Sequence, residues 1–327
     1  MLGSRRFTIF TLVFAGLTAC ASSSHLQDLA PAQEPLPINL ESKFAVIESG
    51  TGKSTLPSPV DAPPAKKTAR KNKPKLPPPF AFPNRRVPFE PIWMGERQVL
   101  EFTYLGVKAG DFTLFVLPWK EIAGRKVYHL QARAVSSTLL ELFYRLNDTI
   151  ESFWDYEGLF SHRFHMVLDQ TKQKRDALEL FDSETKKDFY WNRRNHSEKG
   201  NSESKETFDI PAFPQDSFSA LYYVRTLPLE VGQVYTFPIV SEGRSWDAII
   251  TVMRREKLNT PLGPKMCIVV RPQTRYQGVM QQQKGESLIW LTDDDRRFIV
   301  RVEAEVKVGS VTAKLKAIEP GEKPHVD

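Results

Sequence analysis

The stretch that decides the fold is RFIVRVEAEVKVGSVTAKLKA, residues 297–317. From Phe298 to Val308 an apolar residue stands at every second position, and charged residues fill most of the positions between. Alternation with period two is typical of a β-strand that has one buried and one solvated face. Gly309-Ser310 is a turn signal, and the alternation resumes at Val311. The stretch therefore predicts an antiparallel hairpin.

The same pattern extends outward over the C-terminal two thirds of the chain. Further strands are predicted at 99–104, 112–116, 126–134, 149–155, 163–168, 175–181, 187–191, 233–239, 246–254, 266–271 and 287–291. Two segments have helical spacing instead: 137–146, with Ser136 or Ser137 as N-cap, and 215–227, with Asp216 or Ser217 as N-cap. We predict a mainly β fold, a strongly curved antiparallel sheet or β-barrel-like domain with one or two short helices.

The positive charge of the chain lies outside this β region. The chain has 327 residues and a formal net charge of +6. Residues 1–88 hold 12 Lys+Arg and 5 Asp+Glu, whereas the remaining 239 residues hold 33 and 34, a net charge of −1. A nucleic-acid-binding domain is expected to carry its own basic face, so nucleic acid is not an expected partner.

The N-terminus has the layout of a secretory signal. Arg5 and Arg6 precede a short apolar run, and Leu17-Thr18-Ala19-Cys20 follows. These four residues resemble the lipobox of bacterial lipoproteins, which implies cleavage before Cys20 and acylation of that residue. Several acyl chains make a stable membrane anchor where one would be marginal. Ala21-Ser22-Ser23 lacks the Asp that signals inner-membrane retention in enterobacteria, so we expect an outer-membrane lipoprotein that faces the periplasm.

The segment between the anchor and the β region reads as a tether. We assign residues 1–19 to the signal peptide, 20–88 to the acylated cysteine and a disordered Pro/Lys-rich tether, 89–320 to the β-rich periplasmic domain and 321–327 to a flexible tail. The tether is either a solvated spacer or a cationic contact to anionic lipid, lipopolysaccharide or peptidoglycan. The candidate contact residues are Lys66, Lys67, Arg70, Lys71, Lys73 and Lys75.

Five motifs of the β region resemble a known family. They begin at Gly95-Glu96, at Gly106-Val107, at Asp216-Ser217-Phe218, which runs on to Arg225, at Trp290-Leu291-Thr292-Asp293-Asp294, which runs on to Arg296-Arg297, and at Val308-Gly309-Ser310-Val311. On these motifs the chain is similar to a family of exported Gram-negative proteins catalogued as a domain of unknown function. The resemblance implies a curved antiparallel β structure in the periplasm or at the outer membrane. It supplies no catalytic residues.

The residues show no pattern of a known catalytic or metal site. His162 and His165 are three apart on a predicted strand, so their side chains should face opposite sides, which disfavours chelation. The acidic run Asp293-Asp294-Asp295 is interpreted as a hairpin turn with Arg296 and Arg297 as local counterions. Cys267 lies in an apolar run and is interpreted as a core thiol. No catalytic residue, metal or other cofactor is predicted.

Three functions therefore stay open. The first is a non-enzymatic cell-envelope lipoprotein whose curved domain binds a lipid, glycan or envelope partner. The second is a periplasmic enzyme acting on peptidoglycan or polysaccharide, and the third is a structural tether between outer membrane and cell wall. For the first, the two helices are the expected lid or groove wall, with candidate residues Leu140, Phe143, Phe218, Tyr222 and Tyr223.

Overall fold

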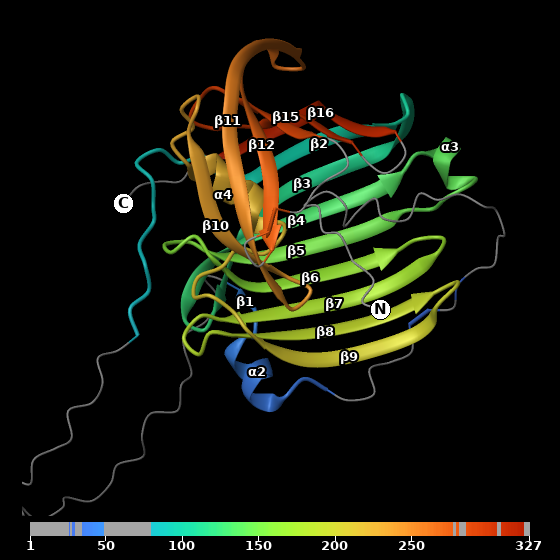
Figure 1. Ribbon diagram of the computed structural model, residues 1–327, viewed down its shortest axis with the longest axis vertical. Helices are drawn as coiled ribbons and strands as arrows, with labels where there is room; N and C mark the ends of the chain where they lie inside the picture. The colour runs from blue at the N-terminus through green and yellow to red at the C-terminus, as the bar shows by residue number, and fades with distance from the viewer. Residues whose placement is uncertain are drawn as a thin grey trace, which may run out of the picture.

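One antiparallel sheet of 16 strands dominates the computed structural model, which describes residues 26, 28–29, 35–48, 80–276, 279–280, 286–305 and 309–323 (Figure 1). Its strands run in the order β10-β11-β12-β14-β15-β16-β2-β3-β4-β5-β6-β7-β8-β9, with β1 beside β3 and β13 beside β12. Their bounds are β1 Ile47–Glu48, β2 Met94–Tyr104, β3 Val107–Ile122, β4 Arg125–Ser136, β5 Asn147–Asp155, β6 Ser161–Asp169, β7 Gln173–Asp182, β8 Lys187–His196, β9 Gly200–Asp209, β10 Val234–Ser241, β11 Arg244–Thr260, β12 Gly263–Tyr276, β13 Val279–Met280, β14 Ser287–Thr292, β15 Ile299–Glu305 and β16 Ser310–Glu322.

The sheet is curved but not closed, which confirms the predicted fold class. Its end strands, β9 and β10, pair with β8 and β11 and not with each other. Strands β10, β11 and β12 arch over the helix α4 (Ser219–Thr226) and cross the direction of β3 to β8 steeply (Figure 1). The largest hydrophobic cluster contains residues from both parts of the sheet and from α4, so the core lies on the concave side.

The hairpin predicted from the deciding stretch is present as β15 and β16, with one irregularity. The pairing of β14 with β15 shifts register between Trp290 and Leu291, which leaves Val300 as an extra residue. Val300 packs with Cys267 and Trp290 in a separate cluster, whereas its neighbour Ile299 packs in the main core. A β-bulge of this kind turns one side chain to the other face, so the strict alternation does not hold at this point.

Both predicted helices are present but shorter than expected. Helix α3 spans only Thr138–Glu141, and its predicted N-cap is confirmed because the Ser137 side chain accepts a hydrogen bond from the Leu140 N–H. In α4 the carboxylate of Asp216 accepts the N–H groups of Phe218 and Ser219, both at 2.7 Å. The sequence predicted one buried stripe on this helix, but seven of its eight residues are buried. The curved sheet surrounds the helix, which is why its polar residues are also buried.

Part of the predicted disordered tether is folded, which corrects its boundaries. Helix α2 (Ile38–Lys43) and β1 lie on the outer side of the sheet, where β1 pairs with Lys120 and Glu121 of β3. Phe44 is 2% exposed, and Leu36 and Leu40 pack against the same cluster. These three residues stand four apart, which is a helical apolar stripe that the sequence analysis overlooked. Burial of this stripe favours a docked segment over a free tether.

Several predicted features lie outside the described residues. They are the signal peptide, Cys20 and the six basic residues Lys66, Lys67, Arg70, Lys71, Lys73 and Lys75. Residues 80–88, assigned to the tether, are described and contact the β domain. Phe82, for example, stacks on Phe160 with ring centroids 6.0 Å apart. Among the helices that the structure describes, none has the length and apolar character needed to cross a membrane.

Docking of the N-terminal segment can be tested at Phe44. Replacing Phe44 with Ala should lower the free energy of unfolding by about 3–5 kcal/mol, because a buried ring is removed from a packed cluster. Urea denaturation followed by tryptophan fluorescence measures this change. The matched control is Ile38→Ala, at a residue that is 84% exposed, which should change the stability by less than about 0.5 kcal/mol. Equal stability of both variants would mean that the segment is a free tether after all.

Candidate functional site

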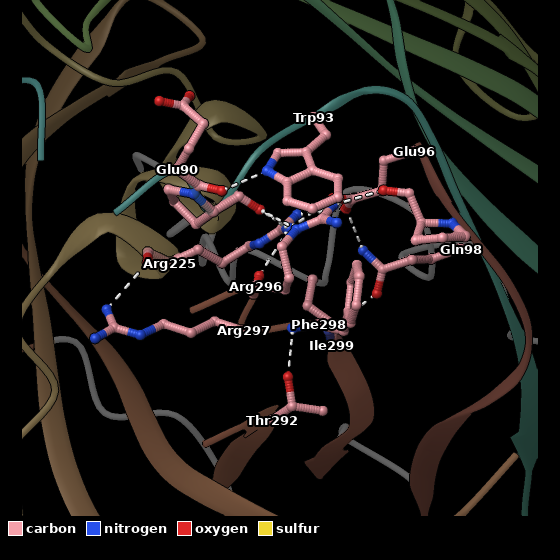
Figure 2. Close-up of polar contacts among 12 residues, drawn as sticks. Glu90, Trp93, Glu96, Gln98, Arg225, Thr292, Arg296, Arg297, Phe298 and Ile299 are labelled. Atoms are coloured by element: carbon pink, nitrogen blue, oxygen red, sulfur yellow. Dashed lines mark hydrogen bonds and ion pairs between the residues drawn. The ribbon is translucent and has the colours of Figure 1, made fainter. Parts of the chain in front are cut away.

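Three of the five motifs that carry the family resemblance meet at one buried carboxylate, that of Glu96 on β2 (Figure 2). Arg225 comes from the last turn of α4, and Arg296 comes from the turn between β14 and β15. Positive φ at Gly95, next to Glu96, and at Gly321 lets β2 and the end of β16 approach closely, since a Cβ at Gly321 would lie 2.6 Å from Glu96 N. The fold thus brings together residues that are 129 and 200 positions apart.

The Glu96 carboxylate accepts four charge-assisted or polar hydrogen bonds. Arg225 donates to both oxygens, with distances of 2.7 Å to Oε1 and 2.8 Å to Oε2. Arg296 donates to Oε2 at 2.7 Å, and Gln98 Nε2 donates to Oε1 at 2.7 Å. The Gln98 amide oxygen in turn accepts the N–H of Ile299 at the start of β15. We call Glu96, Gln98, Arg225 and Arg296 the Glu96 cluster.

Further donors of the two arginines bind backbone carbonyls, whereas Arg225 Nε has no hydrogen-bond partner among the described residues. Arg225 Nη2 donates to Pro91 O at 2.7 Å and to Arg296 O at 3.0 Å. The Arg296 guanidinium lies over the Trp93 ring, 3.6 Å from its centroid, and donates to Pro320 O. The cluster therefore ties α4 to the segment just before β2 and to the end of the neighbouring strand β16.

The acidic run Asp293-Asp294-Asp295 forms the predicted turn, but the side chains of Arg296 and Arg297 make other contacts than expected. Asp294 accepts the N–H groups of Arg296 and Arg297, so the acidic run does form a turn. The side chain of Arg296 binds Glu96, however, and that of Arg297 donates to the carbonyl oxygens of Arg225 and Leu227. The two arginine side chains thus hydrogen-bond to α4 and β2, while the charges of Asp293 and Asp295 still favour the charged form of Arg297, as the predicted counterion role requires.

Electrostatically the Glu96 cluster is a buried ion pair with excess positive charge. Burial favours the neutral form of Arg225, but the adjacent Glu96 carboxylate outweighs it and raises the pKa of Arg225. For Arg296, burial and the nearby Arg225 lower the pKa. A buried guanidinium held by both carboxylate oxygens fixes geometry strongly. Since Glu96 and Arg225 are almost fully enclosed, the cluster positions α4 and does not face solvent.

A second polar cluster surrounds the start of α4. Asp216 Oδ2 accepts hydrogen bonds from Ser152 Oγ at 2.5 Å and Ser161 Oγ at 2.6 Å. Burial raises the pKa of Asp216, and these hydrogen bonds offset part of the increase. Gln215 accepts from Trp154 Nε1 and donates to Leu159 O. Both carboxylate oxygens of Asp216 and both side-chain polar atoms of Gln215 have partners within the domain, so this cluster anchors the other end of α4.

A third cluster holds two buried carboxyl groups on neighbouring strands, Glu179 on β7 and Asp188 on β8. Glu179 accepts the N–H of Gly243 from the β10–β11 turn, and Glu242 of that turn pairs with Arg175 at 2.7 Å. Neither carboxyl oxygen of Asp188 has a hydrogen-bond partner among the described residues. Burial raises the pKa of Asp188 to about 7, and burial together with the charge of Asp188 raises the pKa of Glu179. The sequence analysis missed this pair, although an acid inside the apolar run Ala177-Leu178-Glu179-Leu180-Phe181 was a usable signal.

His162 and His165 bind two different carboxylates. His162 Nε2 lies 2.9 Å from Asp155 Oδ2, and His165 Nε2 lies 2.8 Å from Asp176 Oδ1. Although burial opposes ionisation of Asp155, the hydrogen bonds from Arg125 and His162 hold its pKa well below the usual range. The pairing of β5 with β6 shifts register at His162, so the alternation on which the predicted opposite orientation rests is interrupted between His162 and His165. Within the described part of the chain, no three His, Cys, Asp or Glu side chains form a group that could hold a metal ion.

The predicted lid and groove residues fall into two environments. Phe218 and Tyr222 of the α4 segment are buried in the main core, and Tyr223 packs against it. On α3 and the turn that follows, Leu140 is partly buried, whereas Phe143 is 69% exposed. The structure therefore does not bring the five residues together as one groove, because α4 lies inside the sheet and α3 lies at its rim (Figure 1).

The importance of Glu96 for the fold can be tested with Glu96→Gln. Loss of the carboxylate leaves Arg225 as an uncompensated buried charge, so we expect the free energy of unfolding to fall by about 3–5 kcal/mol in urea denaturation. The matched control is Glu319→Gln, which removes the exposed partner of the neighbouring Arg97 and should cost less than about 1 kcal/mol. If E96Q were as stable as E319Q, the ion pair would not hold α4.

The buried acids predict a particular dependence of stability on pH. An acid whose pKa is raised in the folded state binds more protons there than when unfolded, so stability falls as pH rises from about 4 to about 7. Replacing Asp188 with Asn should flatten this fall and raise the midpoint temperature at pH 8 by a few degrees, measured by calorimetry. Burial also raises the pKa of Asp148 to about 7, so part of the fall in stability between pH 4 and pH 7 should remain in D188N. The exposed control Asp295→Asn should leave the slope unchanged, and an unchanged slope in D188N would contradict the assignment.

Comparisons with known proteins found distantly similar solved structures and one matching family model. Similar solved structures include a β-barrel-like protein of the domain of unknown function DUF1849 from Brucella abortus, with 13% identity, a TM-score of 0.47 and coverage of 69% of this chain and 98% of that one. A candidate lipoprotein from Parabacteroides distasonis has 10% identity, a TM-score of 0.26 and coverage of 71% and 97%. A candidate exported protein with a YmcC-like fold from Bacteroides fragilis has 10% identity, a TM-score of 0.31 and coverage of 71% and 98%.

No curated protein sequence matches the chain. The family model named DUF3108, protein of unknown function, matches residues 100–316, which include β3 to β15, α4 and two of the three charged residues of the Glu96 cluster. This confirms the predicted resemblance to a domain of unknown function. The chain belongs to the DUF3108 family.

Proposed function

We propose that the mature chain is a non-enzymatic cell-envelope lipoprotein, anchored to the outer membrane through acyl chains on Cys20, whose curved β domain binds its partner at the surface. The observation that supports surface binding is the position of α4. Seven of its eight residues are buried, and Ala220, Leu221, Tyr222 and Val224 belong to the core on the concave side of the sheet. A side that is packed with a helix is not free to hold an apolar ligand.

The anchoring of α4 at both ends supports the same proposal. Asp216 holds its start, and Arg225 holds its end through a bidentate ion pair with Glu96. Moving the helix aside would expose two buried charge clusters, and each unpaired buried charge is costly. We therefore treat α4 as a permanent part of the core and not as a lid.

The carboxyl groups do not favour the enzymatic alternative. Hydrolysis of a glycosidic bond needs two carboxyl groups on either side of an accessible bond. Glu179 and Asp188 interact on adjacent strands, but they are 2% and 0% exposed. Nothing in this arrangement offers a route for a polysaccharide, so a binding or scaffolding role is the better proposal.

Two measurements on the chain from its own host test this function. Cells fed a clickable palmitate should label the wild-type chain and the Cys267→Ala control but not Cys20→Ser, because Cys267 is buried and burial raises the pKa of its thiol to about 11. Native mass spectrometry of the labelled protein should give the mass of the acylated chain without a small ligand. A Cys20-independent label would remove the anchor, and a stoichiometric lipid or glycan would show that the interior binds a ligand.

A further inference from the structure

A group of exposed apolar side chains gathers at one end of the sheet. They come from the β2–β3 turn and from α3 with the residues that follow it, and they are 57% to 75% exposed. We call them the α3 rim: Leu105, Val107, Leu139, Leu142 and Phe143. Hydrogen bonds from Ser137 N to Ala109 O at 2.7 Å and from Ser137 Oγ to Lys108 O at 3.2 Å hold the two segments side by side.

The rim is exposed although the chain beside it is firmly held. Tyr144 follows Phe143 directly, is buried, and donates from its hydroxyl to Gln170 Oε1 at 2.9 Å. Arg145 then donates from its backbone N–H to Thr171 and pairs with Asp169 at 2.8 Å. The exposure of Phe143 therefore belongs to the folded structure, and a contiguous exposed apolar patch is a mark of an interaction surface.

The position of Asp28 indicates where the membrane lies relative to the rim if Cys20 is acylated. Asp28 Oδ1 pairs with Lys174 Nζ at 2.6 Å, and Lys174 also lies 3.3 Å from Asp169, the partner of Arg145. Residue 28 is thus held at the same end of the sheet as the rim. Cys20 precedes it by only eight residues, which can span at most about 28 Å when fully extended. An acyl group on Cys20 therefore places the membrane within that distance of Asp28, whose carboxylate binds Lys174.

We propose that the α3 rim lies on the lipid bilayer and inserts its apolar side chains at the membrane interface. The inference rests on the proposed acylation of Cys20, which brings the membrane to this end of the domain. Leucine and phenylalanine side chains on a turn and a short helix can enter the region between headgroups and acyl chains. The domain then stands with the β2–β3 turn and α3 toward the membrane, and with the β14–β15 turn, at the other end of β2, away from it.

Fluorescence quenching in reconstituted vesicles tests this orientation. Acylated Phe143→Cys is labelled with an environment-sensitive dye and placed in vesicles of phosphatidylethanolamine and phosphatidylglycerol that contain spin-labelled acyl chains. The buried Cys267 thiol should not react, because its pKa is raised. The control is Ile47→Cys, at an aliphatic residue that is 50% exposed and pairs with Glu121 near the far end of β3.

We expect the dye at position 143 to shift to the blue and to lose at least half of its emission to the quencher, and the dye at position 47 to change by less than a tenth. Equal quenching at both positions, or no quenching at position 143 in protein that floats with the vesicles, would overturn the proposal. A blue shift without quenching would also overturn it, since a protein contact would then cover the rim. Failure of the proposed anchor gives a different result, because unacylated protein would not float with the vesicles at all.

Discussion

The position of α4 inside the sheet depends on one buried carboxylate, that of Glu96. A bidentate bond to Arg225 sets the end of the helix, and the bond from Arg296 sets the turn before β15. Gln98 extends the same network to the first residue of β15. A buried ion pair contributes less to net stability than its contacts suggest, because both charges lose their hydration. Its main effect here is to allow one arrangement of helix and sheet, since any other leaves a charge unpaired.

The two ends of the sheet meet through a turn and not through strand pairing. Gly243 in the β10–β11 turn has a φ of +67°, and a Cβ there would lie 2.1 Å from the Phe208 ring of β9. Only glycine lets the turn reach this close, so that its N–H can bond to Glu179. The outer strand β9 is rich in Ser, Glu and Lys, which discourages pairing with another sheet. The barrel-like shape is therefore completed by side-chain contacts at one corner.

Whether a strand or helix could be predicted from the sequence depended on how regularly its apolar residues are spaced. Strands with one wet face, such as β15 and β16, follow directly from alternation. Strand β9 was missed because it is polar on both faces. Helix α2 was missed because Leu36, Leu40 and Phe44, in and beside the helix, lie in or next to a Pro-rich stretch. The motifs that contain Glu96, Arg225 and Arg296 were recognised in the sequence, but their contact was not predicted because these residues are far apart in the chain. Complete burial of α4 was not predictable either, since it follows from the curvature of a sheet formed by distant strands.

The helical spacing around α3 predicted the helix correctly, but it did not predict that some of its apolar side chains are exposed. Leu139, Leu140, Phe143 and Leu146 stand at helical spacing, and Leu140 and Phe143 were expected to line a lid or groove wall. In the structure Leu146 is buried and Leu140 is partly buried, but Leu139 and Phe143 are exposed. Exposed apolar side chains contribute little to folding, because their transfer out of water is not completed. Under the proposed function, contacts with a partner are made on the outside of the sheet, because α4 fills the concave side. The rim is a part of that outside with several strongly exposed apolar side chains that packing within the domain does not explain.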